Sequence, residues 1–189
     1  VSLVGSEMCI RDRCGVCETE NTFFRLKRDI DNPIKQEGDG HALGYKWGKP
    51  GFDENNPLDF FWGTCLKCSF TGELNDAKFR QAECNIKHFK EGIRPDGMRI
   101  LLTGLSTGSG IGQALSKRLG DADSLVVVVA KFHLGIYSHS LFQEPVPGNI
   151  ARYYLRLAWV YRDVEKFYPN STFARMGAKF VKLRTRFKL

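Results

Sequence analysis

The sequence predicts an α+β protein in which a small N-terminal zinc ribbon with short β-strands precedes an all-α region. Two observations carry this prediction. The pairs Cys14/Cys17 and Cys65/Cys68 have the Cys-x-x-Cys spacing of zinc knuckles, and turn formers and aromatic residues are frequent around them. From about residue 74 onward, apolar residues recur at three- and four-residue steps, the period of an α-helix. We therefore expect a ribbon module at 14–72 and a helical region at 73–189.

The first thirteen residues, VSLVGSEMCIRDR, resemble a translated sequencing-adapter fragment. They lack the apolar core of a signal peptide, and their positive charges follow the apolar residues instead of preceding them. We therefore expect 1–13 to be an artefactual, disordered leader outside the fold. The sequence also stops at Leu189 inside a basic, helix-like run, so we expect the helical region to be truncated at its C-terminal end.

The composition is that of an ordinary folded domain. Hydrophobic residues make up 42% of the 189 residues, which is ample for a packed core, and no apolar run approaches the length of a membrane-spanning helix. The formal net charge of +7 permits an anionic partner without requiring one. Six cysteines without an export signal favour a reducing compartment and a metal site over disulfides, so we expect a cytoplasmic protein.

The expected elements follow in order along the chain. Aromatic residues predict short strands at 22–28 and 59–64, with too little apolar sequence nearby for an independent core. A helix is expected from residue 74 to about 92. The stretch 121–142 is rich in valine but too long without a turn former to be one strand, which favours a buried helix. The clearest helix is 149–167, capped by Asn149, and Ser171 or Thr172 begins the last one. Short turns containing Pro and Gly predict that these helices form antiparallel hairpins.

Cys14, Cys17, Cys65 and Cys68 are the predicted metal ligands. Each pair places two sulfurs on one tight turn, and two such turns supply the four thiolates that Zn²⁺ binds in a tetrahedron. The alternatives are a redox dithiol and chance buried cysteines. A redox pair would need a strand-to-helix junction in a βαβ context, and this sequence has none. Because no catalytic zinc motif such as HExxH accompanies the four cysteines, we expect a closed, structural site and no catalytic residues.

Several motifs together resemble a bacterial family of uncharacterised proteins, domain of unknown function 2225. The matching segments are CGVC at 14–17, Arg28-Asp29, Asn56-Pro57, FFW at 60–62, CLKC at 65–68 and YYLRLAWVYRD at 153–163. The sequence departs from the family pattern at Phe70-Thr71 and in the glycine-rich stretch 104–112. The resemblance implies a zinc ribbon joined to tetratricopeptide-like helices, and it implies no activity.

The glycine-rich stretch 103–112 also matches TGxxxGxG, the pattern with which short-chain dehydrogenases hold the pyrophosphate of NAD(P). Only 77 residues follow it, too few for the rest of such a fold, and helical sequence precedes it where the first strand should stand. We therefore expect a loop between helices at 104–112 and treat a dehydrogenase as the weakest functional alternative.

Five further positions carry histidine, cysteine or aromatic side chains that call for an interpretation of their own. His41 lies in a turn-rich segment and is expected to be exposed, whereas His133 is expected to be buried or hydrogen-bonded within its helix. Cys84 has the helical spacing of a buried structural thiol. Trp159 and Tyr161 are expected to pack between helices, with the lining of a peptide groove as the alternative.

The leading functional hypothesis is a non-enzymatic, zinc-binding scaffold whose helices bind a protein partner. The alternative is a nucleic-acid-binding zinc-ribbon protein that uses the basic C-terminal helix, because residues 175–188 carry six Lys and Arg residues and no acidic one. Acidic side chains offset the lysines of the ribbon itself, which weakens this alternative. The sequence does not identify the partner or the oligomeric state.

Overall fold

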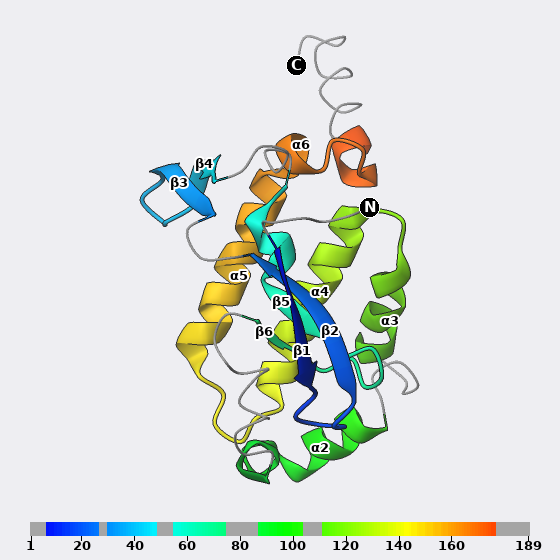
Figure 1. The fold of residues 1–189 in the computed structure, drawn as a ribbon. Helices are drawn as coiled ribbons and strands as arrows, with labels where there is room; N and C mark the ends of the chain where they lie inside the picture. Colours follow the sequence, from blue (N-terminus) through cyan, green and yellow to red (C-terminus); the bar gives the residue numbers. More distant parts are fainter. Residues whose placement is uncertain (1–6, 27–29, 49–54, 75–86, 104–110, 177–189) are drawn as a thin grey trace.

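The fold comprises three small antiparallel sheets followed by a layer of helices (Figure 1). The structure is a computed structural model and describes residues 7–26, 30–48, 55–74, 87–103 and 111–176. Strand β1 (Glu7–Arg13) pairs with β2 (Glu20–Leu26), β3 (Asp31–Gln36) with β4 (Ala42–Trp47), and β5 (Trp62–Thr64) with β6 (Thr71–Glu73). This order of strands before helices confirms the predicted α+β class.

Strand β1 corrects our expectation for the start of the chain. We expected residues 1–13 to be a disordered leader, yet Glu7–Arg13 forms a strand that pairs along its whole length, from Glu7 opposite Leu26 to Arg13 opposite Glu20. Asp12 within it is buried. The physical reason lies in the first knuckle, which is the turn of a hairpin and needs a strand on its N-terminal side. Residues 1–6 lie outside the described part of the chain.

The two predicted strands of the ribbon are partly confirmed. The prediction at 22–28 corresponds to β2, with 27–29 outside the described residues. The prediction at 59–64 is wrong for its first half, because Pro57–Phe60 forms a 3₁₀ turn, η1. Asn56 caps this turn by accepting a hydrogen bond from the backbone N–H of Leu58 at 3.0 Å. Only the second half, β5, is extended.

The helical layer consists of α2 (Pro95–Leu102), α3 (Ile111–Lys117), the 3₁₀ turn η2 (Arg118–Gly120), α4 (Ser124–Ser140), α5 (Pro147–Arg162) and α6 (Val164–Phe167). Residues 87–91 and 172–176 are also helical. In Figure 1, α4 lies between α3 and α5, and it runs opposite to α5. None of the helices in the described ranges is long and apolar enough to span a membrane.

The helix predictions are confirmed in type and adjusted at their ends. The prediction at 121–142 corresponds to α4, which Asp123 caps by accepting from the N–H of Leu125. Helix α5 begins at Pro147 without a side-chain cap, so the prediction that Asn149 caps it is wrong, and the helix is interrupted at Asp163. Of the helix expected at 74–92, only its last turns, 87–91, lie in the described part of the chain.

Two clusters of buried side chains join the ribbon to the helices. The first surrounds the cysteine knuckles and includes Leu101 of α2 and Leu134 of α4. The second contains Phe61 and Trp62, which pack against residues of α4 and α5. Because α4 contributes to both clusters, the ribbon and the helices share one continuous packing arrangement, and neither side of the boundary expected near residue 72 packs alone.

Candidate metal centre

Each Cys-x-x-Cys pair forms the turn of a hairpin, and the two turns have the same backbone geometry. In the first, the N–H of Glu18 donates to the carbonyl of Cys14 at 2.8 Å; in the second, Ser69 donates to Cys65 at 2.9 Å. Glu18 and Ser69, each four residues after the first cysteine of its pair, have left-handed φ angles of 58° and 59°. This turn directs both sulfurs of a pair toward the same side, as a zinc knuckle requires.

The two knuckles bring all four cysteine sulfurs together. The Sγ atoms of Cys14 and Cys68 lie 3.6 Å apart, and those of Cys17 and Cys65 lie 3.5 Å apart. All four lie within 4.8 Å of one another. A tetrahedron of thiolates at the zinc–sulfur distance has edges of about 3.8 Å, so the shortest separations are close to those that Zn²⁺ needs. They are far too long for disulfide bonds, and all four cysteines are free.

The electrostatics of the cluster also favour a cation. The contact with Cys14 lowers the pKa of the Cys65 thiol, whereas the contact with Cys65 raises the pKa of Cys14 and the contact with Cys14 raises the pKa of Cys68. One thiolate is thus stabilised by its neighbours while further ionisation is opposed, because like charges this close repel each other. A bound dication removes that repulsion and allows all four thiols to ionise.

The cluster is closed from solvent on most sides. Cys14, Cys65 and Cys68 are buried, and Cys17 is half-buried. Val16, Phe70 and Leu74 pack around the sulfurs in the first core cluster. Among the described residues, this is the group of Cys, His, Asp and Glu side chains with metal-ligand geometry. The arrangement offers four protein ligands that could hold a metal ion.

Asn21 of β2 supports the cluster and was not identified from the sequence. Its side-chain oxygen accepts a hydrogen bond from the N–H of Leu66 at 3.0 Å, and its amide nitrogen lies 3.6 Å from the sulfur of Cys65. Asn21 therefore ties the first hairpin to the second knuckle and donates toward a ligand sulfur. Its contact partners lie 44 and 45 residues away, so only its position four residues after Cys17 could have drawn attention to it.

Comparison with known protein families finds a match. Residues 13–184 match the family described as "Uncharacterized protein conserved in bacteria (DUF2225)". The chain belongs to this family. The match confirms the resemblance seen in the sequence and begins one residue before the first knuckle. No curated protein and no solved structure matches the chain.

Three further sequence features lie partly or wholly outside the described residues. These are Cys84, the glycine stretch 104–110 and the basic segment after Met176. The residues that precede the glycine stretch form helix α2. A dinucleotide-binding fold needs a strand at that position, so the dehydrogenase alternative gains no support in this member of the 2225 family.

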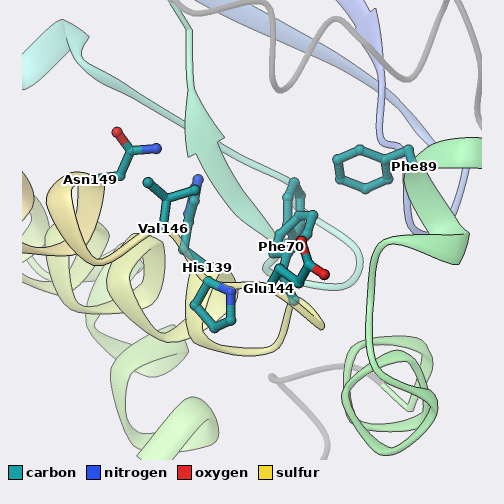
Figure 2. A pocket seen from close by; sticks show the side chains of 8 residues that line it. Phe70, Phe89, His139, Glu144, Val146 and Asn149 are labelled. Atoms are coloured by element: carbon teal, nitrogen blue, oxygen red, sulfur yellow. The ribbon is translucent and has the colours of Figure 1, made fainter.

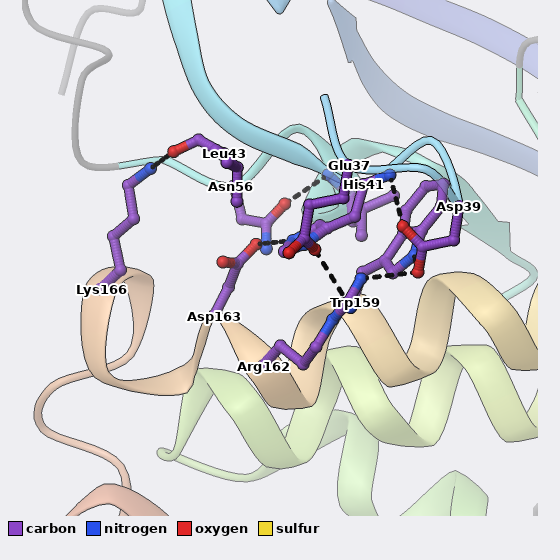
Figure 3. A network of polar contacts seen from close by, with 10 residues as sticks. Glu37, Asp39, His41, Leu43, Asn56, Trp159, Arg162, Asp163 and Lys166 are labelled. Atoms are coloured by element: carbon purple, nitrogen blue, oxygen red, sulfur yellow. Dashed lines mark hydrogen bonds and ion pairs between the residues drawn. The ribbon is translucent and has the colours of Figure 1, made fainter. Parts of the chain in front are cut away.

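His41 corrects our expectation of an exposed loop residue. Its side chain is buried, with Nδ1 2.9 Å from Glu37 and Nε2 2.9 Å from Asp163 at the end of α5 (Figure 3). Its ring stacks on Trp159 at a centroid distance of 5.7 Å. His41 and Trp159 thereby fasten the β3–β4 hairpin to α5, and the prediction that Trp159 packs between helices is wrong.

A small apolar pocket of ≈ 140 Å³ lies between α4, the start of α5 and the segment that carries Phe70 (Figure 2). Phe70, Phe89 and Phe142 line it together with His139 of α4. The Nδ1 atom of His139 lies 2.9 Å from the carbonyl oxygen of Gly135, and Nε2 lies 3.2 Å from the hydroxyl of Tyr153. Within the described part of the chain, no nucleophilic Ser or Cys lines this pocket.

Proposed function

We propose that this member of the 2225 family is a non-catalytic scaffold in which one structural Zn²⁺ fixes the ribbon on helices that bind a protein partner. The observation that carries the proposal is the closed group of four sulfurs from Cys14, Cys17, Cys65 and Cys68. Zinc is the metal that most often takes four thiolates in two Cys-x-x-Cys knuckles. A site without an open ligand position stabilises folding and leaves no place for substrate or water on the metal.

The position of the site explains what the metal would stabilise. Strands β5 and β6 are three residues each, and β1–β2 is an isolated two-stranded sheet. Hairpins of this size are marginal without additional stabilisation. The metal would cross-link the two hairpins. Phe70 and Leu74 belong to the same buried cluster as the cysteines, and this cluster also includes residues of the helical layer. The zinc would thus set the packing of the ribbon on α4.

Support for a protein partner comes from the outer face of α5. Tyr154, Ala158 and Tyr161 lie at helical spacings of four and three residues, and all three are exposed. Tyr161 is 41% exposed, and its ring lies 5.8 Å from that of Phe173, itself exposed. Aromatic residues gathered on one open helix face are typical of protein interfaces. The antiparallel α4–α5 hairpin also agrees with the tetratricopeptide-like scaffold that the resemblance implies.

The metal proposal is tested by elemental analysis of the purified chain and of Cys65→Ser. We expect one zinc per wild-type chain, and for Cys65→Ser a loss of zinc together with increased hydrogen exchange in 7–26 and 62–74. Leu66→Ser is the matched control, because Leu66 lies in the same knuckle and is 87% exposed. A wild-type chain that folds without metal, or a Cys65→Ser variant that keeps both zinc and protection, would overturn the proposal.

The partner proposal is tested by placing a photo-crosslinking amino acid at position 154, at position 161 and, as a control, at position 66. We expect one discrete cross-linked protein from the two α5 positions and none from the knuckle. The identified protein should bind the purified chain, and Ala158→Asp should weaken that binding at least tenfold because it places a charge in the apolar stripe. Equal cross-linking from all three positions would contradict the proposal.

A further inference from the structure

A second cavity lies between the β3–β4 hairpin and α5, away from the cysteine cluster. Its volume is ≈ 710 Å³. The hairpin contributes Asp31, Pro33, Gln36, Gly40, Ala42 and Tyr45; η1 and the residue after it contribute Pro57, Leu58 and Phe61; β6 contributes Glu73; and α5 contributes Asn149, Arg152, Arg156 and Trp159. The lining therefore combines apolar side chains with two carboxylates, Asp31 and Glu73, and with two arginines one helical turn apart.

The two arginines differ in their partners. Arg152 donates to the carboxylate of Glu73 at 2.7 Å, and Glu73 also accepts from Tyr153. Arg156 lies with its guanidinium 4.3 Å from the centre of the Phe61 ring, and its buried Nη1 atom has no hydrogen-bond partner among the residues that the structure describes. A buried donor without a partner is unfavourable, and a buried cationic donor more so. Arg156 thus lines the cavity beside the Phe61 ring, and one nitrogen of its guanidinium is engaged by none of the described residues.

The surrounding charges leave Arg156 available for an anion. Burial lowers its pKa, and the charge of Arg152 lowers it further, but an arginine remains charged at neutral pH. Within the described ranges, Glu73 is the carboxylate that acts on the charge of Arg156, and Arg152 and Tyr153 already donate hydrogen bonds to it. Asp31 also lines the cavity. Its negative charge helps to raise the pKa of Tyr45, and Asp31 is not a carboxylate without a partner.

Neutral donors and apolar surfaces complete the cavity. Burial raises the pKa of Tyr45 to about 12, so its hydroxyl stays protonated and can donate a hydrogen bond. Asn149 adds an amide at the same lining, although its Oδ1 also accepts from Arg152 at 3.3 Å. Pro33, Pro57 and Leu58 present apolar surface beside these donors. Polar groups make up at least as much of the lining as apolar ones, so the cavity suits a ligand that is itself partly charged and partly apolar.

We propose that this cavity binds a small organic carboxylate, whose carboxylate group pairs with Arg156 and whose apolar body packs against Pro33, Pro57 and Leu58. A planar guanidinium matches a carboxylate with two parallel hydrogen bonds. The nearby Glu73 disfavours a phosphate dianion, which would add a second negative charge beside it. The proposal does not depend on zinc at the cysteines or on a partner at the outer face of α5.

The test is a titration of the full chain, as purified, with benzoate, followed by NMR through the indole N–H of Trp159 and the Nε–H of Arg156. We expect saturable binding of benzoate, at least tenfold weaker binding of the uncharged benzamide, and no saturable shift with inorganic phosphate. Arg156→Gln should weaken benzoate binding at least tenfold, whereas the exposed Arg175→Gln should leave it unchanged.

Each other outcome counts against the proposal. Benzoate that fails to bind at millimolar concentration, or that binds equally well to Arg156→Gln, overturns the site. Equal affinity for benzamide shows an apolar pocket without carboxylate recognition, and saturable phosphate binding shows a general anion site. If Arg156→Gln does not fold, as judged by its NMR spectrum, the comparison of benzoate with benzamide in the wild-type chain still decides the matter. Tyr45→Phe provides a second variant, for which we expect weaker benzoate binding.

Discussion

The hydroxyl group of Tyr153 on α5 donates a hydrogen bond to the carboxylate of Glu73 at the end of β6. Tyr153 is 0% exposed and Glu73 only 2%, so this contact lies within the core. A buried carboxylate is tolerated only where other groups compensate its charge, and Arg152 completes the set at 2.7 Å. His139 lies 3.2 Å from the same hydroxyl. The hydrogen-bonded group around the Glu73 carboxylate therefore fixes the position of β6, the last strand of the ribbon, relative to α4 and α5.

Replacing Tyr153 with Phe should destabilise the fold by roughly 1–3 kcal/mol, because the buried carboxylate of Glu73 loses a donor while the ring is retained. Tyr154→Phe is the matched control, since the neighbouring side chain is 53% exposed, and it should change stability by less than about 0.5 kcal/mol. Urea denaturation followed by circular dichroism measures both. Equal stability of the two variants would show that the hydrogen bond to Glu73 is not needed to hold the ribbon in place.

The features that the sequence revealed are those with local signatures. The knuckles follow from the spacing of Cys14, Cys17, Cys65 and Cys68, and α4 follows from the length of its apolar run. Glu73, Tyr153 and His139 have no such signature, because their contacts join residues up to 80 positions apart. Strand β1 was missed for a different reason. Excluding residues 1–13 as foreign removed the strand that the first knuckle needs as its partner, although β5 stands in the equivalent place before the second.

Gly135 of α4 lies against the indole ring of Trp62. A Cβ atom built at this position would lie 2.5 Å from Cη2 of Trp62, which is closer than atoms can approach. Alanine normally favours a helix over glycine by about 1 kcal/mol, yet Gly135→Ala should destabilise the protein by roughly 1–3 kcal/mol because the buried ring must move. Gly148 in the first turn of α5 has no atom within 4 Å of such a Cβ.

Gly148→Ala is therefore the control for Gly135→Ala, and it should leave stability unchanged or raise it slightly. Thermal unfolding of the two variants gives opposite signs if the contact with Trp62 governs the effect. Fluorescence of Trp62 would also shift in Gly135→Ala, provided the other tryptophans, Trp47 and Trp159, are replaced. Stabilisation by both alanines would contradict the packing between α4 and β5.

His41→Ala should loosen the β3–β4 hairpin from α5. The substitution removes the contacts with Glu37 and Asp163 and leaves the largely buried carboxylate of Asp163 without its histidine partner. We expect a local destabilisation of roughly 1–3 kcal/mol, measured as faster hydrogen exchange in 42–47 with little change in α4. Lys46→Ala, on an exposed position of the same strand, is the control. Unchanged exchange in His41→Ala would show that other contacts, such as Lys166 with the carbonyl of Leu43, hold the hairpin.

Asp59→Asn should reduce the pH dependence of stability. Burial raises the pKa of Asp59 to about 6, while the hydrogen bond from Tyr168 and the charge of Lys131 act in the opposite direction. Because the folded pKa lies above the unfolded value of 3.8, the folded protein binds more protons between these two pH values. The stability that the protonated carboxyl contributes is therefore fully present below about pH 4 and is lost as the pH rises through about 6.

Asparagine imitates the neutral carboxyl and can still accept a hydrogen bond from Tyr168. The variant therefore avoids the free-energy cost of burying an ionised carboxylate at neutral pH. We expect equal stability of Asp59→Asn and wild type near pH 4, and a variant more stable by at most about 3 kcal/mol at pH 7.5. Asp96→Asn, whose side chain is 58% exposed, should track the wild type throughout. Comparing each variant with wild type at the same pH and zinc concentration removes the contribution of thiolate protonation, which affects all three chains equally. A variant less stable than wild type at pH 7.5 would mean that the ionised carboxylate is favoured by Lys131 and Tyr168 more than burial opposes it.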